Sequence, residues 1–346
     1  YRPGLGANES AFDYRTLQHD QVGAPQIKAI GGTKYSTDKI LHQHKVGICT
    51  AISLVQNAYV ATGKRYSEDF QYLLQKLYTD GNWFEGSSPF SAISTAKKYG
   101  MLPIEYLPSI LEKEPTLDYD QYKNKLIAIA GDKEKMAFLL SKCEFPIKGY
   151  SRVNVTDVYL IAQAIADSKA GIIARFDLGA SWYTDKNGAL SWNAKDIEPL
   201  RKDTEVVSGH QVTITDYNFS TVMSYNGQLA NTWGPTWADD GSAVFDLKNY
   251  RPTEAWCIYY DFTPDYVPLP DPGTWSHTFV KNMKLGDVTD EVKQLQIKLM
   301  MDKFLARITK EEWGIYGPKT QRAVFDLQIA RNVPLTFYEK YVLRGS

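Results

Sequence analysis

Cys49 stands in the sequence HQHKVGICTAISL, between a glycine-containing turn and an apolar run. A thiol can attack a carbonyl carbon when a base takes its proton, another group orients that base, and donors stabilise the oxyanion. At the start of a helix, a thiolate would also face the positive end of the helix dipole, which lowers the pKa of the thiol. Cys49 is therefore a candidate nucleophile, and an ion pair with an imidazolium is expected at neutral pH.

His210 is the best candidate for the base among five histidines, because it alone opens a strand-like run, GHQVTITDY. Further along, the sequence NTWGPTWADDG begins at Asn231, whose side chain could accept the second N–H of the imidazole. Trp233 could shield that bond from water. These residues would form a Cys, His, Asn site, in that order along the chain.

The other cysteines and histidines have simpler interpretations. Cys143 and Cys257 lie among apolar and aromatic neighbours and are expected to be inert core residues, either unpaired or bridged. His42 and His44 are interpreted as surface residues. Since none of the Cys and His spacings is typical of a metal site, neither a metal nor an organic cofactor is expected.

The elements that must position these residues change in type along the chain. Helical patterns cover residues 49–62, a segment after a Ser67 cap, residues 88–100 with Gly100 as the stop, and a segment from a cap near Asn154 or Thr156 to Gly171. Five later runs have the alternating or β-branched pattern of antiparallel strands, at residues 171–178, 210–218, 221–227, 242–247 and 255–262. Helices followed by strands predict an α+β domain with a cleft between its two parts.

The combination of these residues resembles the papain-like cysteine peptidases. Gln43 stands where that family has the glutamine that completes the oxyanion hole, and Gly47 and Ala51 also fit. Further matching residues are Asn231, Thr232, Trp233, Gly234, Trp237 and Gly241, and Asp13, Tyr14 and Arg15 echo another family sequence. The resemblance touches most of residues 12–262 and implies a two-lobed fold, with a helical lobe and an antiparallel β lobe.

The resemblance also implies a substrate site. Gly86 and Ser87 would lie along the substrate backbone, and polar side chains would line a pocket for the second substrate residue. The predicted substrate-binding residues are Gly86, Ser87, Ser88, Ser208, Gln211, Trp233 and Trp237. We therefore expect a more polar pocket.

Three departures refine the resemblance. Val46 stands where most family members have a disulfide cysteine, and Thr50 replaces an aromatic residue, so the sequence is closer to bacterial or viral members than to the lysosomal type. The separation between Cys49 and His210 is long for the family, which indicates an insertion. We assign it to residues 109–150, which are charged and expected to be helical at the rim of the cleft.

A second domain is predicted after a proline-rich linker. The expected boundaries are residues 1–262 for the peptidase domain, 263–280 for the linker and 281–346 for the last domain. Residues 281–346 resemble the three-helix peptidoglycan-binding-like module, with Val292, Leu295 and Leu299 as a helical stripe against which Ala323, Val324 and Leu327 would pack. Such a module would bind a wall or surface polymer, or act as a spacer or a partner-docking unit.

Composition excludes other classes of function. The 346 residues include 39 basic and 40 acidic side chains without charge blocks, so no nucleic-acid partner is expected. No apolar run is long enough to span a membrane. The expected location is extracellular, in the cell envelope or associated with a virion.

The sequence thus predicts a cysteine endopeptidase that acts on proteins or peptides and is held near a cell wall or surface by its C-terminal domain. Two alternatives remain open. One is a peptidoglycan amidase or endopeptidase, although compact wall amidases lack the NTWG sequence and have Cys and His closer together. The other is an inactive peptidase-like binding or structural protein, against which the intact Cys49, His210, Asn231 and Gln43 argue.

Overall fold

The computed structural model describes most of the first 260 residues and part of the C-terminal segment. The described residues are 7–8, 30–184, 200, 202, 205–219, 225–260, 283, 286–302, 305, 313–317, 320–321, 323–324 and 327. The chain divides into two compact units, and one boundary between them falls between Thr263 and Pro264. The predicted linker and the sequence at residues 13–15 lie outside the described residues.

α1 (Cys49–Thr62) is the central helix of the larger unit. Its first ten residues are all buried, as the apolar composition predicts for a helix enclosed on every side. The helix ends where Gly63 adopts a φ of 73°, a left-handed conformation that costs glycine little. Cys49 is therefore the first residue of the helix, as expected.

Two more helices pack beside α1, and each begins after a serine cap. Ser67 precedes α2 (Glu68–Gln75) and Ser88 precedes α3 (Pro89–Tyr99); each hydroxyl accepts a backbone N–H of the first turn, which would otherwise lack a partner. Gly100 follows α3 with a φ of 83°. Both predicted helices are confirmed.

Between α2 and α3 the backbone widens into a π-helical turn, η3 (Lys76–Asp80), which the sequence did not predict. The turn ends at Gly81, which has a φ of 65°. Single π-helical turns occur often at functional sites, because the wider turn redirects side chains.

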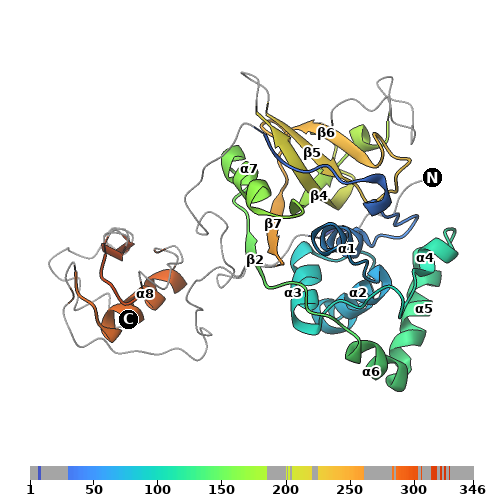
Figure 1. Cartoon of the computed structure of the whole chain (residues 1–346), viewed down its shortest axis with the longest axis horizontal. Coiled ribbons are helices and arrows are strands. Elements are labelled where there is room, and N and C mark those ends of the chain that lie inside the picture. Colours follow the sequence, from blue (N-terminus) through green and yellow to red (C-terminus); the bar gives the residue numbers. More distant parts are fainter. Residues whose placement is uncertain are drawn as a thin grey trace. The chain divides into compact units, whose positions relative to one another are not determined.

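The insertion at residues 109–150 is helical, as predicted. Its helices are α4 (Ile110–Lys113), α5 (Tyr119–Gly131) and α6 (Lys133–Ser141). They lie beside α2 and away from the strands (Figure 1). Tyr122 and Leu126 of α5 are buried in the same apolar core as α1 and α2. The predicted role of this region at the rim of the cleft stays a prediction.

The described strands form one seven-stranded antiparallel sheet. Its main order is β2 (Gly149–Arg152), β7 (Glu254–Tyr259), β3 (Ile172–Leu178), β4 (Ser208–Asn218), β5 (Asn226–Ala230) and β6 (Ser242–Asp246). A short strand, β1 (Ile30–Gly32), pairs with residues 216–218 at the end of β4, whereas β3 pairs with residues 208–214 of that strand. The unit also contains two 3-10 turns, η2 (Thr37–Lys39) and η4 (Ala180–Trp182). The α+β fold expected from the sequence is confirmed.

Sequence reasoning missed two strands. The strand predicted at residues 221–227 shares Asn226 and Gly227 with β5, which continues to Ala230, and residues 221–224 of that prediction lie outside the described residues. β1 and β2 were not predicted. They contain only three and four residues, so they are too short to show an alternating pattern.

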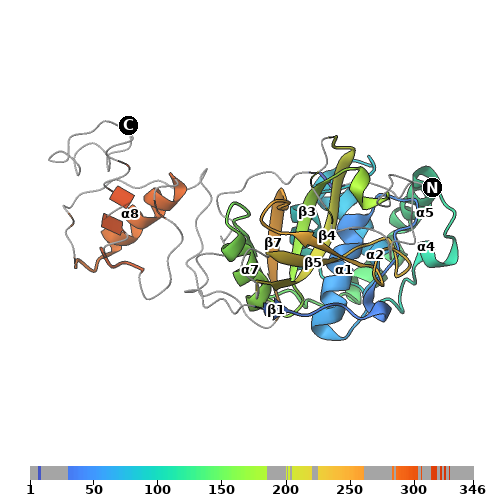
Figure 2. The same ribbon diagram turned by 90° about the horizontal axis from the view of Figure 1, so that it is seen from above.

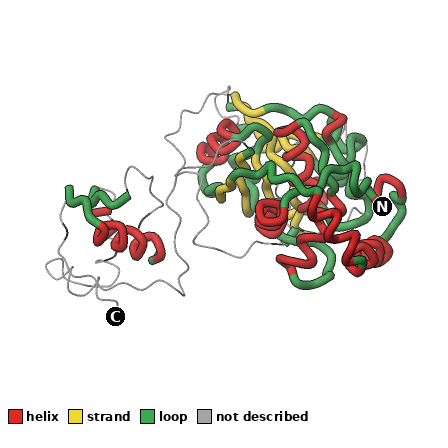
Figure 3. Tube along the Cα trace, turned by 60° about the horizontal axis from the view of Figure 1, so that its bottom comes forward, coloured by secondary structure: helices red, strands yellow, loops and turns green. Residues whose placement is uncertain are grey.

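Helices cover both faces of the sheet. α1 runs along one face beside β4, and most other helices lie on that side of the strands (Figures 2 and 3). α7 (Val158–Asp167) covers the other face, where Cys257 Sγ lies 3.7 Å from the carbonyl oxygen of Ala164. The neighbouring Trp256 faces the opposite way, into the core around α1, as the two-residue period of a strand requires.

The start of α7 corrects a prediction. Asp157 caps this helix by accepting the Tyr159 N–H at 2.8 Å. Asn154, one of the two expected caps, instead accepts the N–H and the hydroxyl of Thr156, the other expected cap. The two residues satisfy each other in a local turn, so the helix begins later.

The smaller unit contains α8 (Asp290–Met301), which begins after a Thr289 cap. The predicted stripe of apolar side chains is buried and forms a core with the later residues expected to pack against it. Members of this core include Val292, Leu295, Leu299, Ala323, Val324 and Leu327. Gln296, also buried, binds Gly314 N, Ile315 O and the Thr320 hydroxyl.

Candidate active site

His210 and Asn231 come from neighbouring strands of the sheet. β4 carries His210, and Asn231 directly follows β5, which pairs with β4 so that Thr213 lies opposite Ala230. This register brings His210 Nε2 within 2.7 Å of Asn231 Oδ1. The same oxygen accepts the Thr232 N–H at 2.7 Å, which fixes the orientation of the amide.

Aromatic rings enclose the His210 imidazole. The centroid of the Trp233 ring lies 4.8 Å from that of the imidazole, and Trp182 meets it edge-on at 5.6 Å. Burial among these rings lowers the pKa of His210 to about 4, against the opposing effect of the Asn231 hydrogen bond. The imidazole is therefore neutral at pH 7 and able to accept a proton. The ion pair expected from the sequence stays a prediction.

Gln43 is connected to the same region through Thr232. The Gln43 N–H donates to the Thr232 carbonyl at 2.8 Å, and the Thr232 hydroxyl donates to Gln43 Oε1. Gln43 Nε2 donates to the carbonyl of Val46 at 3.0 Å. A continuous set of hydrogen bonds thus joins Gln43, Thr232, Asn231 and His210.

Cys49 is fully buried at the start of α1, where that helix packs on β4. Gln211 Nε2 donates to the Thr50 carbonyl at 3.2 Å and to the Ser53 hydroxyl at 2.5 Å. The residue after His210 therefore contacts the residue after Cys49. Nδ1 of His210 is buried and has no hydrogen-bond partner among the described residues, while Nε2 is bound to Asn231.

The other two cysteines are not joined in a disulfide. Burial raises the pKa of the Cys143 thiol to about 11 and that of Cys257 to about 12. Thiols with such pKa values are protonated and poorly nucleophilic at neutral pH. This agrees with the interpretation of both residues as inert.

Several solved structures have a similar fold. The xylellain structure, described as a cysteine protease from Xylella fastidiosa, has 18% sequence identity and a TM-score of 0.56, over 74% of this chain and 96% of that chain. Procathepsin L 3 from the larval midgut of Tenebrio molitor matches with 17% identity and a TM-score of 0.45, over 71% of this chain and 76% of that chain. Bromelain from Ananas comosus matches with 15% identity and a TM-score of 0.42, over 64% and 93%. No family model and no curated sequence matches this chain.

The larger unit has the papain-like fold. These similarities do not support the resemblance of residues 281–346 to a peptidoglycan-binding module, which stays a prediction. In the described part of the chain, no group of His, Cys, Asp or Glu side chains is arranged to hold a metal ion. The described helices are also too short or too polar to cross a membrane.

Within this papain-like fold, residues 7 and 8 lie between the two predicted substrate-binding walls. The Asn8 N–H donates to the Ser87 carbonyl at 2.6 Å, and the Ala7 N–H donates to the Gly209 carbonyl at 3.1 Å. Arg175 Nε donates to the Ala7 carbonyl at 2.9 Å. A Cβ on Gly209 would lie 2.0 Å from that carbonyl, so only glycine permits this close approach. Ser87 and Gly209 therefore form the two edges of a site that holds extended backbone.

The other predicted substrate residues lie in different surroundings. Ser88 caps α3, Gln211 lies in the contact of β4 with α1, and Trp237 is buried with its indole N–H bound to the Trp182 carbonyl at 2.9 Å. Trp233 is buried against His210, and Ser208 is half-buried next to Gly209. Their predicted contact with substrate stays a prediction.

His42 and His44 are more enclosed than the sequence interpretation as surface residues implies. Both are half-buried and their rings stack with centroids 4.0 Å apart. His42 Nδ1 accepts the His44 N–H at 2.9 Å, and His44 has a φ of 52°. Burial, together with the neighbouring His44, lowers the pKa of His42 to about 4. The loop that carries Gln43 is therefore held on both sides.

Sequence reasoning missed Trp182 and Arg175. Trp182 lies in a 3-10 turn after β3, and no spacing connects it to His210. Arg175 lies in β3, and its side chain is only 10% exposed. It contacts Asp177, Thr253 and Ala7. A charged residue within the apolar run GIIARFDL was the one available signal of a specific role.

Proposed function

We propose that the chain is a cysteine endopeptidase. Cys49 attacks the scissile carbonyl, His210 takes the thiol proton at Nδ1, and Gln43 Nε2 donates to the oxyanion with the Cys49 backbone N–H. The imidazolium then protonates the leaving amine, and water hydrolyses the acyl-enzyme with His210 as the base. The observation that carries this proposal is the 2.7 Å contact of His210 Nε2 with Asn231 Oδ1, which directs Nδ1 away from Asn231.

The environment of His210 supports its role as a base. The ring is neutral at pH 7 because burial lowers its pKa to about 4, and Asn231 stabilises the imidazolium by accepting its second N–H. Formation of a negative thiolate beside the ring would raise the pKa of His210, so the proton is transferred as the charge pair forms. The ring is held in one orientation by Trp233 and Trp182.

Covalent labelling tests the proposal. A mechanism-based epoxide should add one reagent mass to the reduced full-length protein and none to Cys49→Ala. Cys143→Ala is the matched control, because it removes a half-buried thiol and should leave the labelling unchanged. A peptide library would then give the cleavage profile. If the folded, reduced wild type is not labelled, the endopeptidase proposal is wrong.

The substrate of the proposed enzyme is an extended peptide. Ser87 and Gly209 already hold extended backbone of this chain through their carbonyl oxygens, which supports a substrate bound by main-chain hydrogen bonds. For the smaller unit we propose binding to a wall or surface polymer, which would hold the enzyme in the envelope, outside the cell or on a virion. Full-length Cys49→Ala should then sediment with purified sacculi, and an unchanged supernatant would contradict this part.

Purified sacculi also distinguish the amidase alternative. The wild type should release little soluble material from sacculi while it degrades a denatured protein. Release of stem peptides without proteolysis would favour the amidase, and absence of both reactions would favour an inactive binding protein.

A further inference from the structure

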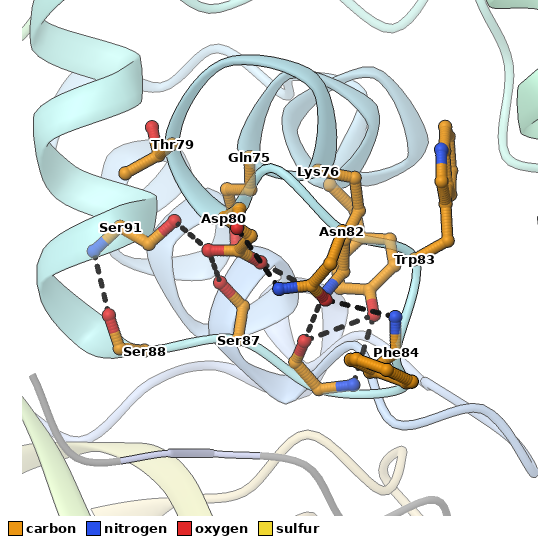
Figure 4. A network of polar contacts seen from close by, with 12 residues as sticks. Gln75, Lys76, Thr79, Asp80, Asn82, Trp83, Phe84, Ser87, Ser88 and Ser91 are labelled. Carbon is orange, nitrogen blue, oxygen red and sulfur yellow. Dashed lines mark hydrogen bonds and ion pairs between the residues drawn. The ribbon is translucent and has the colours of Figure 1, made fainter.

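The edge that contains Gly86 and Ser87 is held by buried charges. Lys76 of the π-helical turn η3 forms an ion pair with Asp80, with Nζ 2.9 Å from Oδ2; the side chains are 1% and 12% exposed. The same ammonium group donates to the Gly86 carbonyl oxygen. Figure 4 shows Lys76 and Asp80 on the inner side of the segment that leads through Ser87 to Ser88.

Asp80 extends this contact to the next residues. Its Oδ1 accepts the hydroxyl of Ser87 at 3.1 Å and that of Ser91, in α3, at 2.7 Å. On the other side, the Tyr72 hydroxyl accepts the Gly86 N–H at 3.0 Å. The N–H and the carbonyl of Gly86 and the hydroxyl of Ser87 are therefore all hydrogen-bonded to side chains of α2 and η3.

The same segment is also linked to the loop before Cys49. Glu85 Oε1 accepts the Gly47 N–H at 2.6 Å, two residues before the candidate nucleophile. None of the three cysteines lies in this segment, so no disulfide can restrain it. Polar contacts and ion pairing therefore set the distance between this edge and the start of α1.

The outward side of this edge is the part that binds extended backbone. The Ser87 carbonyl accepts the Asn8 N–H at 2.6 Å while the Ser87 hydroxyl is bound to Asp80. A buried ion pair costs desolvation, so it is a weak source of stability and a stronger source of fixed geometry. The π-helical turn places both charges within one turn of helix, directly beneath the edge.

We propose that Lys76 and Asp80 are positioning residues that hold Gly86 and Ser87 in the geometry needed to bind the substrate backbone. This inference rests on the proposed endopeptidase function, since it assumes that Cys49 is the nucleophile. Lys76 and Asp80 do not contact the reacting atoms. They act through the edge, so their loss weakens peptide binding and leaves the reactivity of the thiol intact.

Two thiol reagents, one with a peptide arm and one without, test this inference on the full-length protein. Iodoacetamide alkylates Cys49 without using the edge, whereas a peptidyl epoxide must bind along it. Lys76→Met should slow the peptidyl reagent by about tenfold or more, as expected for loss of a charge-assisted contact, with little change for iodoacetamide. Lys97→Met, at an exposed lysine of α3, is the matched control and should change neither rate.

A milder variant covers the case in which Lys76→Met does not fold. Ser87→Ala removes one hydroxyl from Asp80 and leaves the ion pair intact, and it should slow the peptidyl reagent by a smaller factor. Peptide hydrolysis should show the same division, with a raised KM and a similar kcat. Equal slowing of both reagents, or no slowing of either, would overturn the inference. Failure of wild-type Cys49 to react with both reagents would instead overturn the proposed function.

Discussion

The two sides of the candidate active site are stabilised by different kinds of side chain. On the helical side Lys76 and Asp80 contact the Gly86–Ser87 edge, and Glu85 accepts the Gly47 N–H. Elsewhere in this lobe α2 buries the acidic pair Glu68 and Asp69. The sheet side surrounds His210 with the rings of Trp182 and Trp233 and with the neutral amide of Asn231. Charge thus fixes the edge that binds extended backbone, and apolar rings fix the base.

A buried acid of α2 and the buried base of the sheet side should respond to pH in opposite ways. Burial raises the pKa of Asp69 to about 7, with a further contribution from Glu68, whereas burial lowers the pKa of His210 to about 4. Protonation of Asp69 relieves a buried charge, while protonation of His210 creates one. These two residues therefore stabilise the fold at opposite ends of the pH range.

The largest expected effect comes from removing the reactive group of either side. Cys49→Ser and His210→Gln should each lower kcat for peptide hydrolysis by about 10³-fold or more, because nucleophile and base act as a unit. The double variant should be little worse than either single variant. Steady-state kinetics with a fluorogenic peptide measures this. Additive losses would show that the two side chains do not cooperate.

Loss of the orienting amide should have a smaller effect. Asn231→Ala leaves His210 enclosed by its rings but removes the 2.7 Å contact with Nε2, so we expect kcat to fall by roughly 10²-fold, within the range of a general acid–base contribution. Asn226→Ala, at an exposed residue of β5, is the matched control. Equal activities of the two variants would contradict an orienting role for Asn231.

The pH dependence of stability tests the comparison directly. An unfolded histidine has a pKa near 6.5 and folded His210 one of about 4, so the unfolded state binds more protons between these values. The free energy of unfolding should therefore fall with decreasing pH, by about 3 kcal/mol through this residue, and His210→Gln should remove that loss. Urea unfolding followed by tryptophan fluorescence at pH 7, 6 and 5 measures the slope.

Asp69 should have the opposite sign. Its folded pKa lies above its unfolded value, so its contribution to stability is present at low pH and is lost as the pH rises towards 7. Relative to the wild type, Asp69→Asn should gain stability with rising pH, whereas His210→Gln should gain it with falling pH. Slopes of the same sign in both variants would contradict the opposite effects of burial on these two residues.

The ends of several helices, the strand β4 and the placement of Cys49 could be predicted from the sequence, because local signals determine them. Caps at Ser67 and Ser88, the stop at Gly100 and the alternation in β4 gave the correct elements. The contact between His210 and Asn231 was expected from their order and type. The caps, the stop and the strand depend on hydrogen bonds within a few residues or on the period of a single strand, whereas the contact of His210 with Asn231 joins neighbouring strands.

The charged network could not be predicted in the same way. Lys76 and Asp80 occur in a sequence typical of a solvated helix, and their burial depends on the π-helical turn and on the return of the chain at Gly86. Similarly, the stacking of His42 on His44 requires the positive φ of His44, which no neighbouring residue type signals. Such contacts come from tertiary packing, which overrides local preference.

The smallest expected effect concerns residues 7 and 8, which contact both sides at once. Ala7→Pro removes the N–H that donates to the Gly209 carbonyl on the sheet side, and a substrate backbone must compete for that same acceptor. Losing one hydrogen bond of about 1 kcal/mol should weaken the competitor and raise kcat/KM by about fivefold. Asn8→Ala keeps every backbone donor and serves as the control. If Ala7→Pro leaves kcat/KM unchanged while the protein stays folded, a substrate does not use the Gly209 edge, and only the charged helical side would hold its backbone.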